Sequence, residues 1–384
     1  MRLLFITDFT EQFAYRLLRG ILNYSKETEP WVVYKMHPSH KKSLGMRGLV
    51  RWAVDWHADV VIGLFEPYED VNLFKKHGIV VIAQDYISKF PSIPNITANY
   101  DVTGAMAARF FVTRGFKNFG FLGYGGVCWS EDRCQGFVNE IKRSGIDTVY
   151  INNSLLINNF READASVFDK WVMMLPKPIA VMCCDDTIAN ALLEHCKVCG
   201  VSVPSEVAVI GVDNDEIMCD MSDPALSSIN VDIERGGYET ARLAAEMVRE
   251  HRFDGEDIVL QPTNVVPRVS TNVFATQDAS VLTALQFIGQ NSRRKISVKD
   301  VLSVVPMSRR LLEQRFLKET GSTIYQYITM VRMNVFARML VESKDPISEI
   351  AAQLDEPDTK SISRRFLAVK GCTPSEFRKR KIQK

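Results

Sequence analysis

The sequence lacks an uncharged apolar run long enough to cross a bilayer, which requires about 20 residues. Its first apolar stretch, Leu3–Ile6, is short and is soon followed by Asp8. The apolar core and the small-residue cleavage site of a signal peptide are therefore missing as well. From these absences we expect a cytoplasmic protein without a membrane partner.

Patterns typical of cofactor and metal sites are also missing. Neither GxGxxG nor GxxxxGK[ST] occurs, so no nucleotide cofactor is expected. Cys196 and Cys199 have CxxC spacing, but no second pair of ligands lies nearby, and reduced cysteines on a helix explain the pattern better. The spacing of Glu11, His57 and Asp85 does not bring these groups together for acid–base catalysis. We expect no metal, no cofactor and no enzymatic activity.

The charge is unevenly distributed along the 384 residues. The net charge is only +1, but residues 281–384 hold 20 basic and 10 acidic side chains, a net charge of +10. Residues 1–280 hold 27 basic and 36 acidic ones, a net charge of −9. A chain of this length predicts two or three domains. The asymmetry favours nucleic acid as the partner of the basic end, although a solvated basic face would give the same charge.

The first 260 residues alternate short apolar runs with helical patterns. The runs are continuous rather than alternating, which is typical of strands buried on both faces of a parallel sheet. We predict strands at Leu3–Thr7, Val60–Leu64, Ile79–Ala83, Phe119–Gly123, Ile179–Cys183 and Val207–Val212. We predict helices near Phe13–Lys26, Asp101–Arg114, Glu131–Arg143, Asp186–Cys199 and Ile233–His251. This rhythm indicates α/β sheets, whose ligands lie at the carboxyl ends of the strands.

The pattern changes after Leu260. Pro262, Pro267 and several Thr residues interrupt it, which predicts a first domain over 1–262 and a linker over 263–280. Residues 281–384 are predicted to be all-helical. The expected helices are Val281–Asn291, Val298–Val304, Ser308–Lys318, Ile324–Val341, Ile347–Gln353 and Thr359–Val369.

The helical end contains an internal repeat. Arg315-Phe316-Leu317 precedes Gly321, and fifty positions later Arg365-Phe366-Leu367 precedes Gly371. Leu312 with Phe316 and Ile362 with Phe366 each form one apolar stripe on a helix. A short helix and a turn come before each stripe, so we predict two helix-turn-helix motifs.

The opposite stripes suit contacts with bases. They carry Arg310, Glu313 and Gln314 in the first motif and Lys360, Ser363 and Arg364 in the second. Arg can pair with guanine, Gln with adenine, and Glu can accept from cytosine. Two copies on a +10 segment favour DNA binding over a merely solvated helical bundle.

This end resembles the AraC/XylS-type DNA-binding domain. The matching residues are Ser308, Leu312, Arg315-Phe316, Gly321, Tyr327-Ile328, Arg332, Ala337, Leu340, Ile350-Ala351, Ser363, Arg365-Phe366, Gly371, Thr373-Pro374 and Phe377-Arg378. The resemblance implies that a long helix, Ile324–Val341, ties together two motifs that read successive major-groove segments of operator DNA. It implies DNA contacts by Arg309, Arg310, Glu313, Gln314, Thr359, Lys360, Ser363 and Arg364.

The chain departs from that family in both turns. Pro306 and Leu302 replace the usual Gly and Ala of the first motif, and Asp355-Glu356 replaces the usual Gly-Phe of the second. Asp tolerates a left-handed backbone. The acids at 355, 356 and 358 would repel phosphate, so we expect weaker DNA binding by the second motif.

Motifs in the first 260 residues resemble the periplasmic-binding-protein-like effector domain of lactose/galactose repressors. They are Arg133-Cys134-Gln135-Gly136-Phe137, Cys183-Cys184-Asp185-Asp186, Val209-Ile210-Gly211-Val212-Asp213-Asn214, Pro224-Ala225-Leu226-Ser227-Ser228-Ile229, Asp232 and Gly237. The resemblance implies a two-lobed α/β domain that binds a sugar.

A sugar site needs carboxylates, a cation and aromatic rings. Carboxylates accept charge-assisted hydrogen bonds from hydroxyls, an Arg donates to oxygens, and a ring covers the apolar face of the sugar. The resemblance assigns ligand contacts to Asp213, Asp185 and Arg133, and more loosely to Asn99. Candidates for stacking are Phe13, Tyr15 and Trp129. Helix N-capping is the alternative role for such acids, and we favour it for Asp186 and Asp101.

A sugar sensor followed by an AraC-type domain resembles xylose-responsive activators of transcription. That resemblance implies D-xylose as the effector, a homodimer, operator DNA and RNA polymerase as a partner. Three alternatives remain: another sugar such as arabinose, a solute-binding protein of a transporter, and an α/β enzyme fused to helices.

Overall fold

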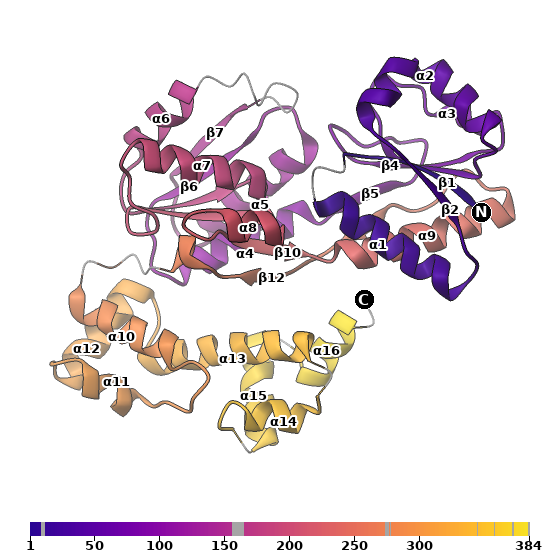
Figure 1. Ribbon diagram of the computed structural model, residues 1–384. Helices are drawn as coiled ribbons and strands as arrows, with labels where there is room; N and C mark the ends of the chain where they lie inside the picture. The colour runs from indigo at the N-terminus through magenta and orange to yellow at the C-terminus, as the bar shows by residue number, and fades with distance from the viewer. Residues whose placement is uncertain are drawn as a thin grey trace. The chain divides into compact units, whose positions relative to one another are not determined.

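The computed structural model describes residues 1–8, 12–155, 165–272, 276, 278–343, 345–356, 358–370 and 372–382. The chain divides into two compact units. The N-terminal unit is formed by Met1–Arg109 with Asn118–Asn272, and the C-terminal unit by Phe110–Lys117 with Val273–Lys384. Figure 1 shows α/β layers in the first and helices alone in the second.

The N-terminal unit contains two lobes, each built on a six-stranded sheet. The strand orders are β11-β5-β4-β3-β1-β2 in lobe 1 and β12-β10-β9-β8-β6-β7 in lobe 2, and all strands pair in parallel except β12. The strands are β1 (Arg2–Ile6), β2 (Val32–Met36), β3 (Val60–Leu64), β4 (Val80–Gln84), β5 (Asn95–Ala98), β6 (Phe119–Tyr124), β7 (Val149–Leu155), β8 (Ile179–Cys183), β9 (Val207–Asp213), β10 (Ser227–Val231), β11 (Ile258–Leu260) and β12 (Pro262–Val266). The α-helices are α1 (Gln12–Glu27), α2 (Pro38–Asp55), α3 (Asn72–Lys75), α4 (Tyr100–Val112), α5 (Cys128–Arg143), α6 (Ala165–Met174), α7 (Asp186–Val198), α8 (Glu216–Met221) and α9 (Ile233–Glu250).

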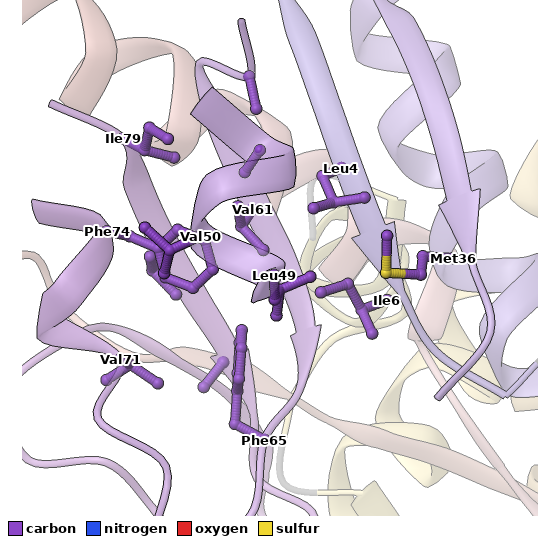
Figure 2. Close-up of a cluster of buried hydrophobic side chains, with 14 of the residues drawn as sticks. Leu4, Ile6, Met36, Leu49, Val50, Val61, Phe65, Val71, Phe74 and Ile79 are labelled. Atoms are coloured by element: carbon purple, nitrogen blue, oxygen red, sulfur yellow. The ribbon is translucent and has the colours of Figure 1, made fainter. Parts of the chain in front are cut away.

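Both faces of the first sheet are buried. Leu4 and Ile6 belong to a core with residues of α2 and α3, including Leu49 and Phe74 (Figure 2). Since successive side chains of a strand point to opposite faces, Leu3, which is also fully buried, lies on the other face. This double burial explains the continuous apolar runs of the sequence.

The chain crosses between the lobes three times, and the crossings are hydrogen-bonded to one another. They lie at Asn99, Asp232 and Gln261. Asn99 Nδ2 donates to Gln261 Oε1 at 2.6 Å, and the Gln261 backbone N donates to Asp232 Oδ1 at 2.5 Å. These residues therefore form the hinge.

All six predicted strands are confirmed to within one residue at each end. The other six strands were missed. They are short, half exposed or polar, as in Asn95–Ala98, and so carry no continuous apolar run. Their partners in the sheet, not their own sequence pattern, make them strands.

The predicted linker over 263–280 is wrong for its first ten residues. Pro262–Val266 forms β12, which pairs antiparallel with β10, and Val269–Thr271 forms a 3₁₀ turn, η2. Pro262 is tolerated because it stands at the first position of an edge strand.

The C-terminal unit has two cores that share one helix. Its helices are α10 (Ala279–Gln290), α11 (Val298–Val304), α12 (Arg309–Thr320), α13 (Ile324–Glu342), α14 (Ile347–Ala352), α15 (Thr359–Lys370) and α16 (Pro374–Ile382). Ile324 and Ile328 of α13 pack with α10, α11 and α12, whereas Met333 and Phe336 pack with α14 and α15. The six helices predicted here are confirmed, and α13 is the tie between two helix-turn-helix motifs.

Candidate effector site and DNA interface

The candidate effector site is centred on Arg133 in α5. This helix crosses α4 closely because a glycine stands on each side of the contact. A Cβ at Gly104 would lie 2.0 Å from the Arg133 carbonyl oxygen, and one at Gly136 would lie 2.0 Å from that of Asp101. The two glycines thus allow the backbones of α4 and α5 to touch, and this close packing fixes the position of Arg133 relative to α4.

The Arg133 side chain is buried and bound to the ends of two strands. Its Nη1 donates to the Cys184 carbonyl after β8, and its Nη2 lies 3.2 Å from Asp213 Oδ1 at the end of β9. Burial, the largest single influence, would lower the pKa of this guanidinium, but the electrostatic interactions with Asp213 and with neighbouring groups such as Asp185 together raise it. Arg133 therefore stays charged beside a carboxylate.

Two aromatic rings flank the same guanidinium. Arg133 Cζ lies 5.3 Å from the ring centroid of Tyr100 and 5.2 Å from that of Trp129. Tyr100 Oη donates to Asp85 Oδ1 at 2.7 Å, and Trp129 Nε1 donates to the Tyr86 carbonyl at 2.8 Å. Asp85 and Tyr86 follow β4 of lobe 1, whereas Trp129 begins α5 of lobe 2, so the cluster joins the lobes.

Two carboxyl groups near Arg133 have raised pKa values. Burial raises the pKa of Asp85 to about 6, against hydrogen bonds and the positive charges of Lys89 and Arg133. Burial also raises the pKa of Asp185 to about 6, against its hydrogen bond from the Ile188 backbone. Neutral carboxyls in this cluster can donate as well as accept hydrogen bonds.

The Asp85 shift predicts a pH dependence of stability. In the folded chain Asp85 keeps a proton that the unfolded chain, with a carboxyl pKa near 3.9, has already released, so the free energy of unfolding falls as pH rises from about 4 to about 6. This fall in the free energy of unfolding amounts to about 3 kcal/mol, and Asp85→Asn should abolish it. Urea unfolding followed by tryptophan fluorescence should show that the free energy of unfolding of the variant rises relative to that of the wild type between pH 4 and pH 7. A difference that is constant with pH would contradict the shift.

The structure places the N-cap of α7 at Asp185 and not at Asp186, where it was predicted. Asp185 is the N-cap of α7, and its Oδ1 accepts from the Ile188 backbone N at 2.7 Å. The sequence favours N-capping for Asp186, but in the structure its Oδ2 accepts from the Asp215 backbone N at 2.8 Å. The N-cap is one residue earlier than predicted, and Asp185 also interacts electrostatically with Arg133 and Asp213.

The remaining predicted ligand residues have other surroundings. Asn99 lies in the hinge and is bound to Gln261. Tyr15 is 48% exposed on α1, with Lys35 Nζ 5.4 Å from its ring centroid. Phe13 is half-buried in the first turn of α1. The structure thus gathers Arg133, Asp213, Asp185 and Trp129, and those four carry the candidate site.

Sequence reasoning missed Arg16, which spans the lobes. From α1 of lobe 1, its Nη1 donates to the Asp213 carbonyl at 2.8 Å, and its Nη2 donates to the Val231 carbonyl at 2.9 Å. An Arg on an amphipathic helix is indistinguishable in sequence from one on a solvated face. From the sequence, Asp85 is considered only as an acid–base group with Glu11 and His57, and nothing in the sequence marks its actual partner Tyr100, fifteen positions away.

The first helix-turn-helix motif consists of α11 and α12. Arg309, Arg310 and Gln314 are exposed on α12, as contacts with DNA require. Glu313 is partly buried, and its Oε2 accepts from the Ile324 backbone N at 3.4 Å, at the start of α13. This bond gives Glu313 a structural role beside the predicted one.

The second motif consists of α14 and α15, with Lys360 and Arg364 exposed and Thr359 and Ser363 partly buried. Asp355 has a φ of 54°, the left-handed backbone that the usual Gly would adopt. Glu356 is 3% exposed and lies 2.6 Å from both Arg332 Nη1 and Arg365 Nη2. Pro357 lies outside the described residues.

These contacts change the electrostatics expected for the second motif. Burial would raise the pKa of Glu356, but Arg365 and Arg332 lower it below its usual range, so its charge is neutralised inside the protein. Asp358 Oδ1 accepts from the Lys360 and Ser361 backbone N atoms at the start of α15. Glu356 therefore presents no free charge to a phosphate.

Loss of Arg310 and loss of Arg364 should affect different base pairs. Each alanine substitution should cost about 1–3 kcal/mol on the preferred sequence and relax selection at one end of the site, since a bidentate contact is lost. Selection from randomised duplexes measures this, with Lys318→Ala on exposed α12 surface as the control. Equal weakening on all sequences would instead identify phosphate contacts.

Comparisons with known proteins match both units. A model described as a periplasmic binding protein-like domain matches residues 108–271, and one described as a helix-turn-helix domain matches residues 302–380. The xylose operon regulatory protein of Escherichia coli K12 is 28% identical over 339 residues, which cover 84% of each chain. That of Haemophilus influenzae is 27% identical over 329 residues, or 83% of this chain and 84% of the relative. Over most of its length the chain is thus similar to the xylose operon regulatory proteins.

The chain thus joins a periplasmic binding protein-like domain to a helix-turn-helix domain. A solved structure of a xylose-binding transcription activator aligns over 98% of this chain and 97% of that chain, with a TM-score of 0.58 and 21% identity. The predicted fold class is thereby confirmed. Among the described residues no helix is long and apolar enough to span a membrane, and no group of three or more metal-ligating side chains is found.

Proposed function

We propose that the protein is a cytoplasmic, D-xylose-dependent activator of xylose-utilisation genes and not an enzyme. The observation that carries the proposal is the homology over 84% of the Escherichia coli regulator, because it spans the effector and DNA-binding parts together. The pair formed by buried Arg133 and partly exposed Asp213 at the carboxyl ends of the strands supports a site for a small polyhydroxylated ligand.

In this proposal the sugar binds between the lobes. The carboxylates of Asp213 and Asp185 accept from its hydroxyls, Arg133 donates to an oxygen, and Trp129 covers an apolar face. Phe13, Tyr15 and Asn99 stay second-rank candidates for contacts made on closure. Sugar shifts the equilibrium toward a closed sensor only if it binds that state more tightly.

The DNA contacts are proposed for the exposed stripes of α12 and α15. They are the exposed Arg309, Arg310, Gln314, Lys360 and Arg364 and the partly buried Glu313, Thr359 and Ser363 beside them. A homodimer would double these contacts on operator DNA, and an activator of this kind would act on RNA polymerase. Closure of the sensor would change the spacing of the two DNA-binding parts in such a dimer.

Calorimetric titration of the full chain with D-xylose, L-arabinose and D-ribose tests the effector. We expect saturable heat with D-xylose and a gain in affinity for a duplex selected by the protein itself. Heat with arabinose alone would keep the regulator and change its effector. No sugar response and no retardation of any duplex at low salt would overturn the proposed function, since phosphate contacts are strongest there.

A further inference from the structure

Three arginines from different parts of the N-terminal unit meet at the Asp213–Asn214 dipeptide. Arg133 of α5 holds the Asp213 carboxylate, and Arg16 of α1 holds the Asp213 carbonyl at 2.8 Å. Arg268, which follows β12, donates from Nη1 to Asn214 Oδ1 at 3.0 Å. The dipeptide is thus bound at once by the candidate sugar site, by lobe 1 and by the segment that leads out of the unit.

The backbone of this dipeptide is held in an unusual conformation. The φ angles are 95° at Asp213 and 51° at Asn214, in the region that residues other than glycine rarely adopt. Such backbone persists only where surrounding contacts impose it, and it is typical of ligand-binding and switch segments. A change in the contacts of Asp213 can therefore be relieved by rotation at Asn214.

Arg268 is held by several partners besides Asn214, so a movement of Asn214 is passed on to a group of residues that are fixed to one another. Its Nη1 also donates to the Leu226 carbonyl at 2.9 Å, and its Nε lies 3.3 Å from Asp220 Oδ1. Its backbone N donates to Ser227 Oγ at 2.7 Å. Only 16% of the Arg268 side chain is exposed, which keeps these bonds largely out of water.

The segment after Arg268 is fastened to lobe 2 up to the point where it leaves. Ser270 Oγ donates to the Val209 carbonyl of β9 at 2.6 Å, and Thr271 Oγ1 lies 2.7 Å from Ser227 Oγ. The N-terminal unit ends at Asn272, and α10 begins at Ala279. The seven Cα–Cα steps between them can span at most roughly 25 Å, so the exit segment is a short tether to the DNA-binding helices.

We propose that Asn214 and Arg268 are the positioning residues that couple sugar binding at Asp213 to the exit segment, and through it to DNA affinity. This inference rests on the proposed function. Sugar bound to the Asp213 carboxylate competes with Arg133 and rotates the dipeptide, and Asn214 carries that rotation to Arg268. Neither Asn214 nor Arg268 needs to touch sugar or DNA.

The test compares full-length wild type, Asn214→Gly and Arg268→Lys. Glycine removes the amide but accepts the left-handed backbone. Lysine keeps the charge near Asp220 but cannot serve Asn214, Leu226 and Asp220 together. For each protein we would measure affinity for the selected duplex with and without saturating D-xylose, and xylose affinity with and without the duplex.

In the wild type the two ratios should be equal by linkage and at least about fivefold. In both variants they should fall to within twofold of one, while xylose affinity without DNA and DNA affinity without xylose change less than threefold. Arg143→Ala, on a side chain that is 75% exposed, should keep the full ratio. Circular dichroism and thermal unfolding confirm that the compared proteins are folded.

Two results would overturn the coupling role. One is an undiminished ratio in both folded variants. The other is a loss of xylose affinity of more than tenfold in either, which would place the residue in the sugar site. A wild type that does not respond to any sugar would instead refute the proposed function, so the two failures are distinct.

Discussion

Glu356→Ala should destabilise the C-terminal unit by about 3–5 kcal/mol. The substitution leaves Arg332, only 3% exposed, with a buried charge and no carboxylate, and breaking one side of a buried ion pair costs this much. It also releases Arg365, and so loosens α15 from α13. We expect the second motif to lose its folded structure, and with it its DNA contacts, before the first motif does.

Urea unfolding of the full chain can separate the two units. The last of the five tryptophans is Trp171, so tryptophan fluorescence follows the N-terminal unit, whereas far-UV circular dichroism follows the helices of both. Glu349→Ala, an exposed acid on α14, is the matched control and should cost less than about 0.5 kcal/mol. A Glu356→Ala transition within 1 kcal/mol of the wild type would show that the ion pair contributes little.

Asp213→Asn should lower D-xylose affinity by about 3 kcal/mol, or roughly 100-fold. The amide keeps the size of the side chain and tolerates the positive φ, but it loses the charge that strengthens hydrogen bonds from hydroxyls. Calorimetric titration of the full chain measures the loss, and affinity for DNA without sugar should be unchanged.

Glu194→Gln makes the same chemical change on an exposed position of α7 and should leave the titration curve unaltered. If Asp213→Asn binds xylose as the wild type does, Asp213 has no ligand role. The Arg133–Asp213 pair would then serve only the packing of α5 against β9.

The architecture was predictable because it depends on patterns repeated along the chain. Val60–Leu64 and Ile179–Cys183 are buried on both faces, and such burial leaves a continuous apolar run. The apolar stripes that end in Phe316 and Phe366 likewise indicate which face of each recognition helix is buried. Strands such as β12, whose neighbours in the sheet supply most of their stability, leave no comparable trace.

The candidate site was only partly predictable, because its decisive contacts join residues far apart in sequence. Asp213 and Arg133 follow recognisable motifs, but nothing local marks Arg16 as a partner of Asp213 across 197 positions. Glu356 was expected to repel DNA, since its partner Arg332 lies a whole helix away. One-residue shifts, as between Asp185 and Asp186, depend on where a strand ends and a helix begins.

The way β12 and η2 are fastened to lobe 2 bears on the construction of hybrid regulators. A fusion point at residue 262 would strip an edge strand from the receptor and expose the backbone of β10. A fusion point after Asn272 leaves that sheet intact. It also transfers α10 and the helices that follow together with Asp278, the N-cap of α10. Exchange of effector specificity between such proteins should therefore succeed at the later junction and give insoluble product at the earlier one.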